Sequence, residues 1–87
     1  MAHYYVSLYF DREKGFNFAA AVELIEVAEE NRSTSFGTPE TGIPSLAASA
    51  DPGDMAFSFD RVDQASDFAK KVLSLEFILS ARIGLYR

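Results

Sequence analysis

The chain contains no cysteine in its 87 residues and only one histidine. Disulfide bridges, thiol nucleophiles and cysteine-based metal sites are therefore excluded. The histidine, His3, stands beside the chain end, so an exposed terminal residue is favoured over a catalytic base. No apolar run approaches the roughly 18 residues typical of a transmembrane helix, and no signal-peptide pattern opens the chain. We therefore expect a cytoplasmic protein that has no membrane attachment, and we predict no cofactor and no metal site.

Basic residues are also scarce, with 8 Lys and Arg against 13 Asp and Glu, for a net charge of −5. Phosphate binding normally needs a basic surface, so this balance disfavours nucleic acid and anionic membranes as partners. It favours a small acidic protein that could meet a basic partner. Hydrophobic residues make up 48% of the sequence, which is enough for one domain, residues 1–87, with one modest core.

The first third of the chain predicts a strand followed by a helix. His3–Phe10 alternates with the period of two that is typical of a strand. Asn17 is a suitable N-cap for a helix that ends near Asn31. At about 100° per residue, one apolar face of this helix should be buried: Phe18, Ala21, Val22, Leu24, Ile25 and Ala28. Ala20 and Val27 fall outside this face, so the apolar arc is wider than one sheet contact requires and hints at a second contact surface.

The same helix carries the densest group of carboxylates, which are Glu23, Glu26, Glu29 and Glu30. They could bind a cation or a basic partner, but a solvated helix face is favoured, because divalent cations usually take ligands from a turning loop. The glycines of residues 37–42 lack the lysine of a phosphate loop, and no serine stands in a nucleophile-elbow pattern. A noncatalytic role is therefore favoured over an enzyme.

Residues 32–53 form a long segment rich in Ser, Thr, Gly and Pro, and all 3 prolines of the chain lie in it. Loops of this length are uncommon in compact domains unless they are functional, mobile or contain a further element. A second strand is needed to complete a sheet, and both Ser33–Gly37 and Ser45–Ala50 are candidates. Neither pattern is strong, so we expect a short strand at a sheet edge.

The last third repeats the strand and helix and adds a final strand. In Asp54–Asp60, Met55, Phe57 and Phe59 point to one side. Asp60 is a good N-cap for a helix that ends near Leu75, and Ala81–Tyr86 alternates again. The order β-α-β-β-α-β predicts an α+β, ferredoxin-like sandwich, in which two helices cover one face of a four-stranded antiparallel sheet. The crossover rule places the first and third strands in its centre.

The uncovered side of this predicted sheet is the candidate interaction face. We name it the open face, and its predicted residues are Tyr5, Ser7, Tyr9, Ala56, Ser58, Arg82 and Tyr86. Tyrosines separated by small residues make a flat amphipathic surface. Such a surface could stack against a second copy, remain solvated, stack on single-stranded nucleic acid or bind a small ligand, and the first of these is favoured.

Two short segments resemble known families. Gly53–Phe59 resembles the third-strand motif of RNA-recognition domains, which would imply RNA bases stacked on aromatic side chains. It departs from that motif at Asp54, where an aromatic residue is expected, and at Pro52, where a basic one is expected. Asp11–Phe16 resembles the first loop of ACT-type regulatory domains, which would imply an amino-acid ligand close to the backbone of Gly15 at a dimer interface.

Three functional hypotheses follow. The favoured one is a small noncatalytic protein-interaction or regulatory domain that forms a homodimer through the open face, or binds another protein there. The second is a single-stranded RNA-binding module that uses the tyrosines of that face. The third is a small-ligand or enzymatic site formed by the loop of residues 32–53.

Overall fold

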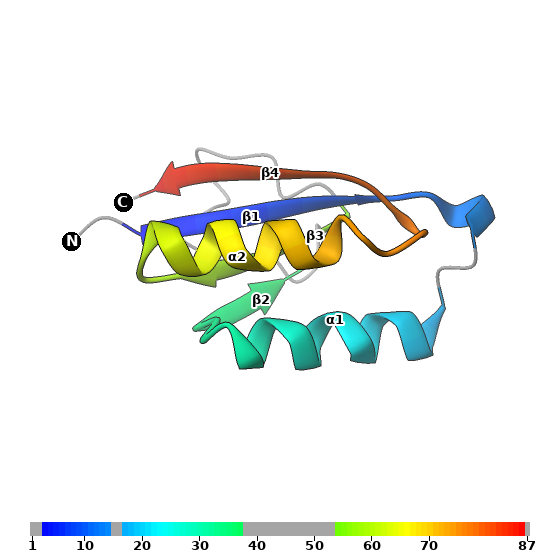
Figure 1. The fold of residues 1–87 in the computed structure, drawn as a ribbon, viewed down its shortest axis with the longest axis horizontal. Coiled ribbons are helices and arrows are strands. Elements are labelled where there is room, and N and C mark those ends of the chain that lie inside the picture. The colour runs from blue at the N-terminus through cyan, green and yellow to red at the C-terminus, as the bar shows by residue number, and fades with distance from the viewer. Residues whose placement is uncertain (1–2, 15–16, 38–53, 87) are drawn as a thin grey trace.

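The structure is a computed structural model that describes residues 3–14, 17–37 and 54–86. Its elements follow one another along the chain (Figure 1) as β1 (His3–Phe10), the 3-10 turn η1 (Arg12–Lys14), α1 (Phe18–Glu30), β2 (Ser35–Gly37), β3 (Met55–Phe59), α2 (Val62–Val72) and β4 (Ile78–Tyr86). The candidate strand Ser45–Ala50 and most of the segment 32–53 lie outside the described residues.

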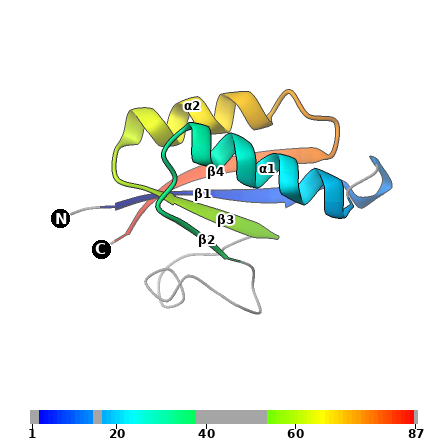
Figure 2. The same ribbon diagram turned by 90° about the horizontal axis from the view of Figure 1, so that it is seen from below.

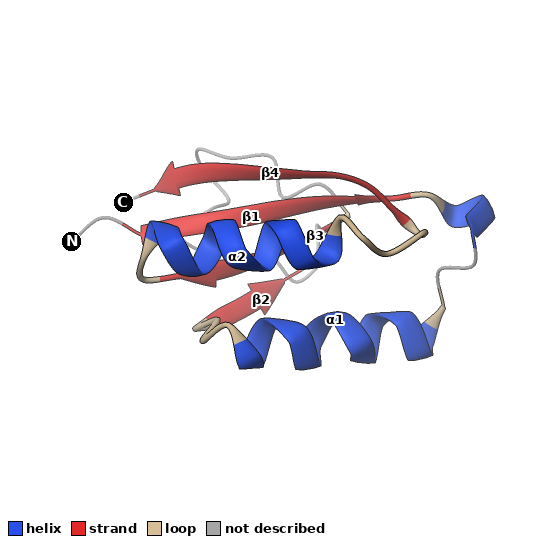
Figure 3. Ribbon diagram, viewed as in Figure 1, coloured by secondary structure: helices blue, strands red, loops and turns tan. Residues whose placement is uncertain are grey.

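The four strands form one antiparallel sheet in the order β2-β3-β1-β4. Both helices lie on the same face of this sheet (Figure 2). The α+β class is therefore confirmed, as is the prediction that the first and third strands lie in the centre. In Figure 3, α2 crosses the middle of the sheet, whereas α1 lies beside β2 at one edge.

The core lies between the sheet and the helices, on the face that the alternation of β1 predicts. Val6 and Leu8 are fully buried there. Val6 stands opposite Phe57 of β3 on one side and Ile83 of β4 on the other, and cross-strand partners point to the same face of a sheet. The Phe68 ring of α2 packs on this layer, and its centroid lies 4.9 Å from that of Phe57.

The second strand is the short edge strand that the sequence predicts. β2 occupies three residues, Ser35–Gly37, within the first of the two candidate segments. Its start is attached to β3, since the Thr34 N–H and the Ser33 hydroxyl both donate to the Ser58 carbonyl, at 2.8 and 3.0 Å. Such a short strand exposes few backbone groups at the edge of the sheet.

Helix α1 begins and ends as predicted. The Asn17 side chain accepts a hydrogen bond of 3.0 Å from the Ala20 N–H, and the chain leaves the helix at Asn31. Arg32 then takes a positive φ of 65°, in the region that favours glycine after a helix. The N–H groups of Arg32 and Ser33 donate back to the last turn, which satisfies carbonyls that a helix end leaves free.

The predicted buried face of α1 is wrong in part. The fully or nearly buried residues are Ala20, Leu24 and Ala28, whereas Phe18 is 85% exposed and Val22 is 36% exposed. The buried face is rotated because α1 packs against α2, and two alanines spaced by eight residues allow a close approach of the helices. The wide apolar arc thus divides into an inner and an outer part.

Helix α2 starts one residue later than predicted. Its N-cap is Arg61, which has no side-chain capping bond, and not Asp60. Arg61 keeps an extended backbone, with φ −129° and ψ 143°, so the helical turn begins at Val62. At the other end the helix stops at Val72, before the predicted Leu75.

Strand β4 is longer than predicted. It begins at Ile78 and not at Ala81, and nine residues run along β1. The pairing shifts register between Tyr9 and Phe10 of β1, opposite the start of β4. This irregularity explains why the alternation in sequence becomes clear only from Ala81.

Candidate functional site

The sheet brings the residues of the open face together as predicted. Tyr5 stands opposite Ser58 of β3 and Gly84 of β4, and Ser7 stands opposite Ala56 and Arg82. Tyr9 is paired with Ser80, and the backbone of Tyr86 with that of His3. All these positions therefore lie on the side of the sheet away from the helices. The side chain of Tyr86 lies outside the described residues.

The middle of this face has little exposed surface. Ser7 is 1% exposed, and Ala56 and Ser58 are 0% exposed. These three side chains are small and lie on the two central strands of the sheet. Tyr5 is itself half-buried, and its ring lies so close over Gly84 that any Cβ there would overlap it. Tyr9 is half-buried and Arg82 is exposed.

Exposed apolar side chains are found at the two edges of the sheet, along α1 and at the two ends of α2. The large ones are Phe18, Val22, Phe36, Val62, Leu73, Leu79, Ile83 and Leu85. Single exposed apolar residues are normal on a protein surface, whereas contiguous groups often mark contact sites. Two groups stand out, and they lie on opposite sides of the molecule.

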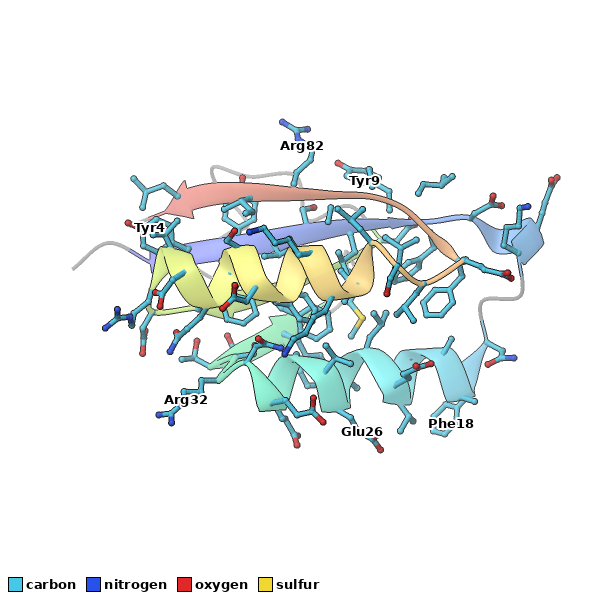
Figure 4. All side chains as sticks on the ribbon, viewed as in Figure 1. Tyr4, Tyr9, Phe18, Glu26, Arg32 and Arg82 are labelled. Carbon is cyan, nitrogen blue, oxygen red and sulfur yellow. The ribbon has the colours of Figure 1, made fainter. Side chains whose placement is uncertain are left out.

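The first group belongs to the outer edge of β4, and we name it the β4 edge. It consists of Leu79, Ile83 and Leu85, which are 63%, 44% and 54% exposed. Ile83 and Leu85 pair with Val6 and Tyr4 of β1, so both point to the helix face. The one charged side chain of the strand is Arg82, which Figure 4 shows projecting outward from β4, on the side opposite to β1.

The second group lies along α1 and β2, and we name it the α1 strip. It comprises the exposed Phe18, Val22 and Phe36 together with Ile25, which is half-buried and also packs against the core. Figure 4 shows Phe18 and Glu26 on the side of α1 away from α2. Phe36 is 50% exposed, and its ring centroid lies 5.8 Å from that of the buried Phe57.

A shallow hollow joins the helical and strand parts of the α1 strip. Its volume is about 170 Å³, and its lining includes Ile25, Ala28, Glu29 and Phe36. Sequence reasoning detected the excess apolar arc of this helix but placed Phe18 and Val22 in the core. It missed Phe36 altogether, because the strand that carries it gives only a weak signal in sequence.

A larger hollow of about 410 Å³ lies where the end of α1 meets the start of α2. It is polar and carries charges of both signs, which are Glu30, Arg32, Arg61, Asp63 and Asp67. Arg61 Nε donates to Asp63 Oδ1 at 2.9 Å. This hydrogen bond, with the attraction between the two charges, lowers the pKa of Asp63 and raises that of Arg61. Because both side chains are mostly exposed, the pair adds little to stability.

Asp54 has a structural role at the start of β3. Its Oδ2 accepts a hydrogen bond of 2.8 Å from the Phe10 N–H, and its own N–H donates to the Leu8 carbonyl at 2.8 Å. These bonds attach the start of β3 to the end of β1. These hydrogen bonds explain why an aspartate stands here, where the RNA-recognition motif has an aromatic residue.

Within the described ranges, no group of three or more His, Asp or Glu side chains is arranged to hold a metal ion. The helices of the same ranges are too short and too polar for any of them to cross a membrane. The site is therefore described by its apolar surfaces and by the charges around them.

No family model, no curated protein and no solved structure matches the chain.

Proposed function

We propose that this chain is a small noncatalytic protein-interaction domain of ferredoxin-like topology, which forms a homodimer by pairing β4 with β4 of a second copy. The topology is supported by the antiparallel order β2-β3-β1-β4, with one helix between β1 and β2 and another between β3 and β4. The dimer is supported above all by the β4 edge. The burial of Ser7, Ala56 and Ser58 moves the proposed contact from the open face to this edge.

The two edges of the described sheet differ in how they resist pairing. Natural edge strands are usually short, bulged, or protected by charge or proline. β2 has three residues, whereas β4 has nine, with a single charged side chain and no proline. The register shift of β4 lies at its start, which leaves the later residues regular. A long apolar edge of this kind favours the addition of another strand.

The sequence of β4 favours one register for a symmetric dimer. Two antiparallel copies related by a two-fold axis can be centred on any residue of the strand. A centre at Arg82 sets two Arg82 side chains directly opposite each other, which is unfavourable. A centre at Ile83 pairs apolar side chains with one another, Ile83 with Ile83 and Ala81 with Leu85, and places Arg82 opposite Gly84. We therefore assign the axis to Ile83.

The test uses the absence of cysteine. An Ile83→Cys variant carries one thiol per chain, and the proposed axis brings the two thiols face to face within disulfide range. We expect a disulfide-linked dimer on mild oxidation, seen on a non-reducing gel. The matched control is Leu73→Cys at the end of α2, a position as exposed as Ile83, and this variant should stay monomeric on the same gel.

Sizing with light scattering provides the second measurement. The unmodified chain should elute as a dimer, and Ile83→Lys should convert it to a monomer that retains its circular dichroism spectrum. Phe18→Lys, which removes a more exposed apolar side chain elsewhere, should leave the dimer intact. A monomer for the unmodified chain at high concentration would contradict the proposal.

A further inference from the structure

We propose that the α1 strip is a second binding surface, which receives a basic amphipathic helix of another protein. This inference is independent of the homodimer, because it concerns the opposite side of the molecule.

The spacing of the strip fits a helical partner. Phe18, Val22 and Ile25 stand at positions i, i+4 and i+7 of α1, and so form one line along the helix. Phe18 is 85% exposed, whereas a phenylalanine in a folded domain is usually buried. Phe36 continues the line onto β2, across the hollow of about 170 Å³. A helix laid along α1 would cover all four side chains.

The charges around the strip indicate which partner fits. Every charged residue of α1 is a glutamate, at positions 23, 26, 29 and 30. All four are exposed, and Glu29 also lines the hollow beside Phe36. No basic residue lies in the last turn, where the helix dipole favours one. An apolar line within an acidic surface is complementary to a helix with an apolar face and flanking Lys or Arg.

The same charges argue against a second copy of this chain at the strip. Two α1 helices packed side by side would bring eight glutamates together with no basic residue between them. Such repulsion opposes association most strongly at low salt. The occupant is therefore a chain of opposite charge.

Binding is tested with a synthetic helix of defined chemistry. The probe is a fluorescent peptide of about 18 residues with leucine on one face and lysine on the other, long enough to cover the strip. Two control peptides accompany it, one with glutamate in place of lysine and one with the same composition in scrambled order. Fluorescence anisotropy against the unmodified chain should show saturable binding of the probe alone. Equal binding of the scrambled peptide would overturn the proposal, since charge alone would then explain it.

Variants of the chain locate the binding site. Phe18→Ala should weaken binding of the probe at least about fivefold, as expected for an anchor residue. The matched control is Leu73→Ala, which removes an apolar side chain that is 50% exposed at the end of α2 and should bind as the unmodified chain does. The double change of Glu23 and Glu26 to Gln should weaken binding, and should also flatten its dependence on salt.

Amide chemical shifts decide between this surface and any other. Addition of the probe should move the resonances of α1 and β2 and leave those of β4 in place. Shifts confined to β4, or a Phe18→Ala variant that binds normally, would overturn the inference. So would conversion of a dimer to a monomer by Phe18→Ala, because the strip would then be covered by a second copy.

Discussion

The two helices lie on the same face of one sheet but distribute their apolar side chains differently. α2 buries Phe68 and Val72 together with two alanines, and its backbone lies close to β1, β3 and β4. α1 buries two alanines and Leu24, and leaves Phe18 and Val22 at the surface. The longer and more apolar helix thus contributes less to the core. Folding accounts for the apolar residues of α2 except Val62, which is 51% exposed at the start of the helix, whereas Phe18, at 85% exposed, calls for another explanation.

The charges of the two helices show the same contrast. α2 has Asp63 in its first turn and Lys70 and Lys71 in its last, the arrangement that the helix dipole favours. α1 has no acidic residue in its first turn, and Glu29 and Glu30 lie near its C-terminal end, where negative charge is unfavourable. The charges of α2 stabilise the helix that carries them. The charges of α1 do not stabilise their own helix, which agrees with a surface that binds a partner.

The largest difference should appear when one phenylalanine is removed from each helix. Phe68 is 0% exposed and packs between Phe57 and Phe59, so Phe68→Ala should lower the free energy of unfolding by about 3–5 kcal/mol. Phe18→Ala removes a side chain that is 85% exposed and should change it by less than about 0.5 kcal/mol. Urea unfolding followed by circular dichroism measures both.

Leu24→Ala provides the reference for a buried position of α1, with an expected loss of about 2–5 kcal/mol. If Phe18→Ala were as damaging as Leu24→Ala, the outer part of α1 would belong to the core and the contrast between the helices would fail.

A smaller difference should appear at the helix starts. Asn17 caps α1 through its side chain, so Asn17→Ala should cost about 1 kcal/mol of stability. Arg61 makes no capping bond to α2 and its side chain is exposed, so Arg61→Ala should leave stability nearly unchanged. The same unfolding experiment compares them. If Asn17→Ala lowered stability no more than Arg61→Ala does, the hydrogen bond of the Asn17 side chain would contribute nothing.

Most of the fold could be predicted from sequence because the periodicity of each element is local. The alternation of β1 and the Asn17 cap depend on residues that are neighbours in the chain, and both are as predicted. The orientation of α1 could not be predicted in the same way. Its apolar arc contains two lines of residues, and the choice between them depends on α2, which is distant in sequence. Ala20 and Ala28 face the core because small side chains allow close packing there.

The candidate surfaces were harder to predict from the sequence for the same reason. Pairing placed Tyr5, Ser7 and Arg82 on one face as predicted, but burial depends on what surrounds each residue in space. Leu85 has the pattern of an ordinary strand residue until the strand order places β4 at an edge, and Leu79 lies outside the predicted strand Ala81–Tyr86. Edge strands cannot be identified from the pattern of one strand alone.

The smallest effect on stability should come from neutralising one charged residue on each helix. This pair of changes tests the contrast in charge directly. Glu26 lies three or four positions from Glu23, Glu29 and Glu30, and each such like-charge pair costs about 0.2–0.5 kcal/mol. Glu26→Gln should therefore stabilise the chain by about 0.5–1 kcal/mol at low salt. Lys70→Gln should destabilise it by about 0.3–1 kcal/mol, because a favourable charge in the last turn of α2 is lost. Both effects should shrink in concentrated salt, as exposed charges are screened. If the increase in stability from Glu26→Gln persisted in high salt, it would come from helix propensity or packing. Repulsion among the glutamates of α1 would then not destabilise the chain, and a basic partner would have no such repulsion to remove.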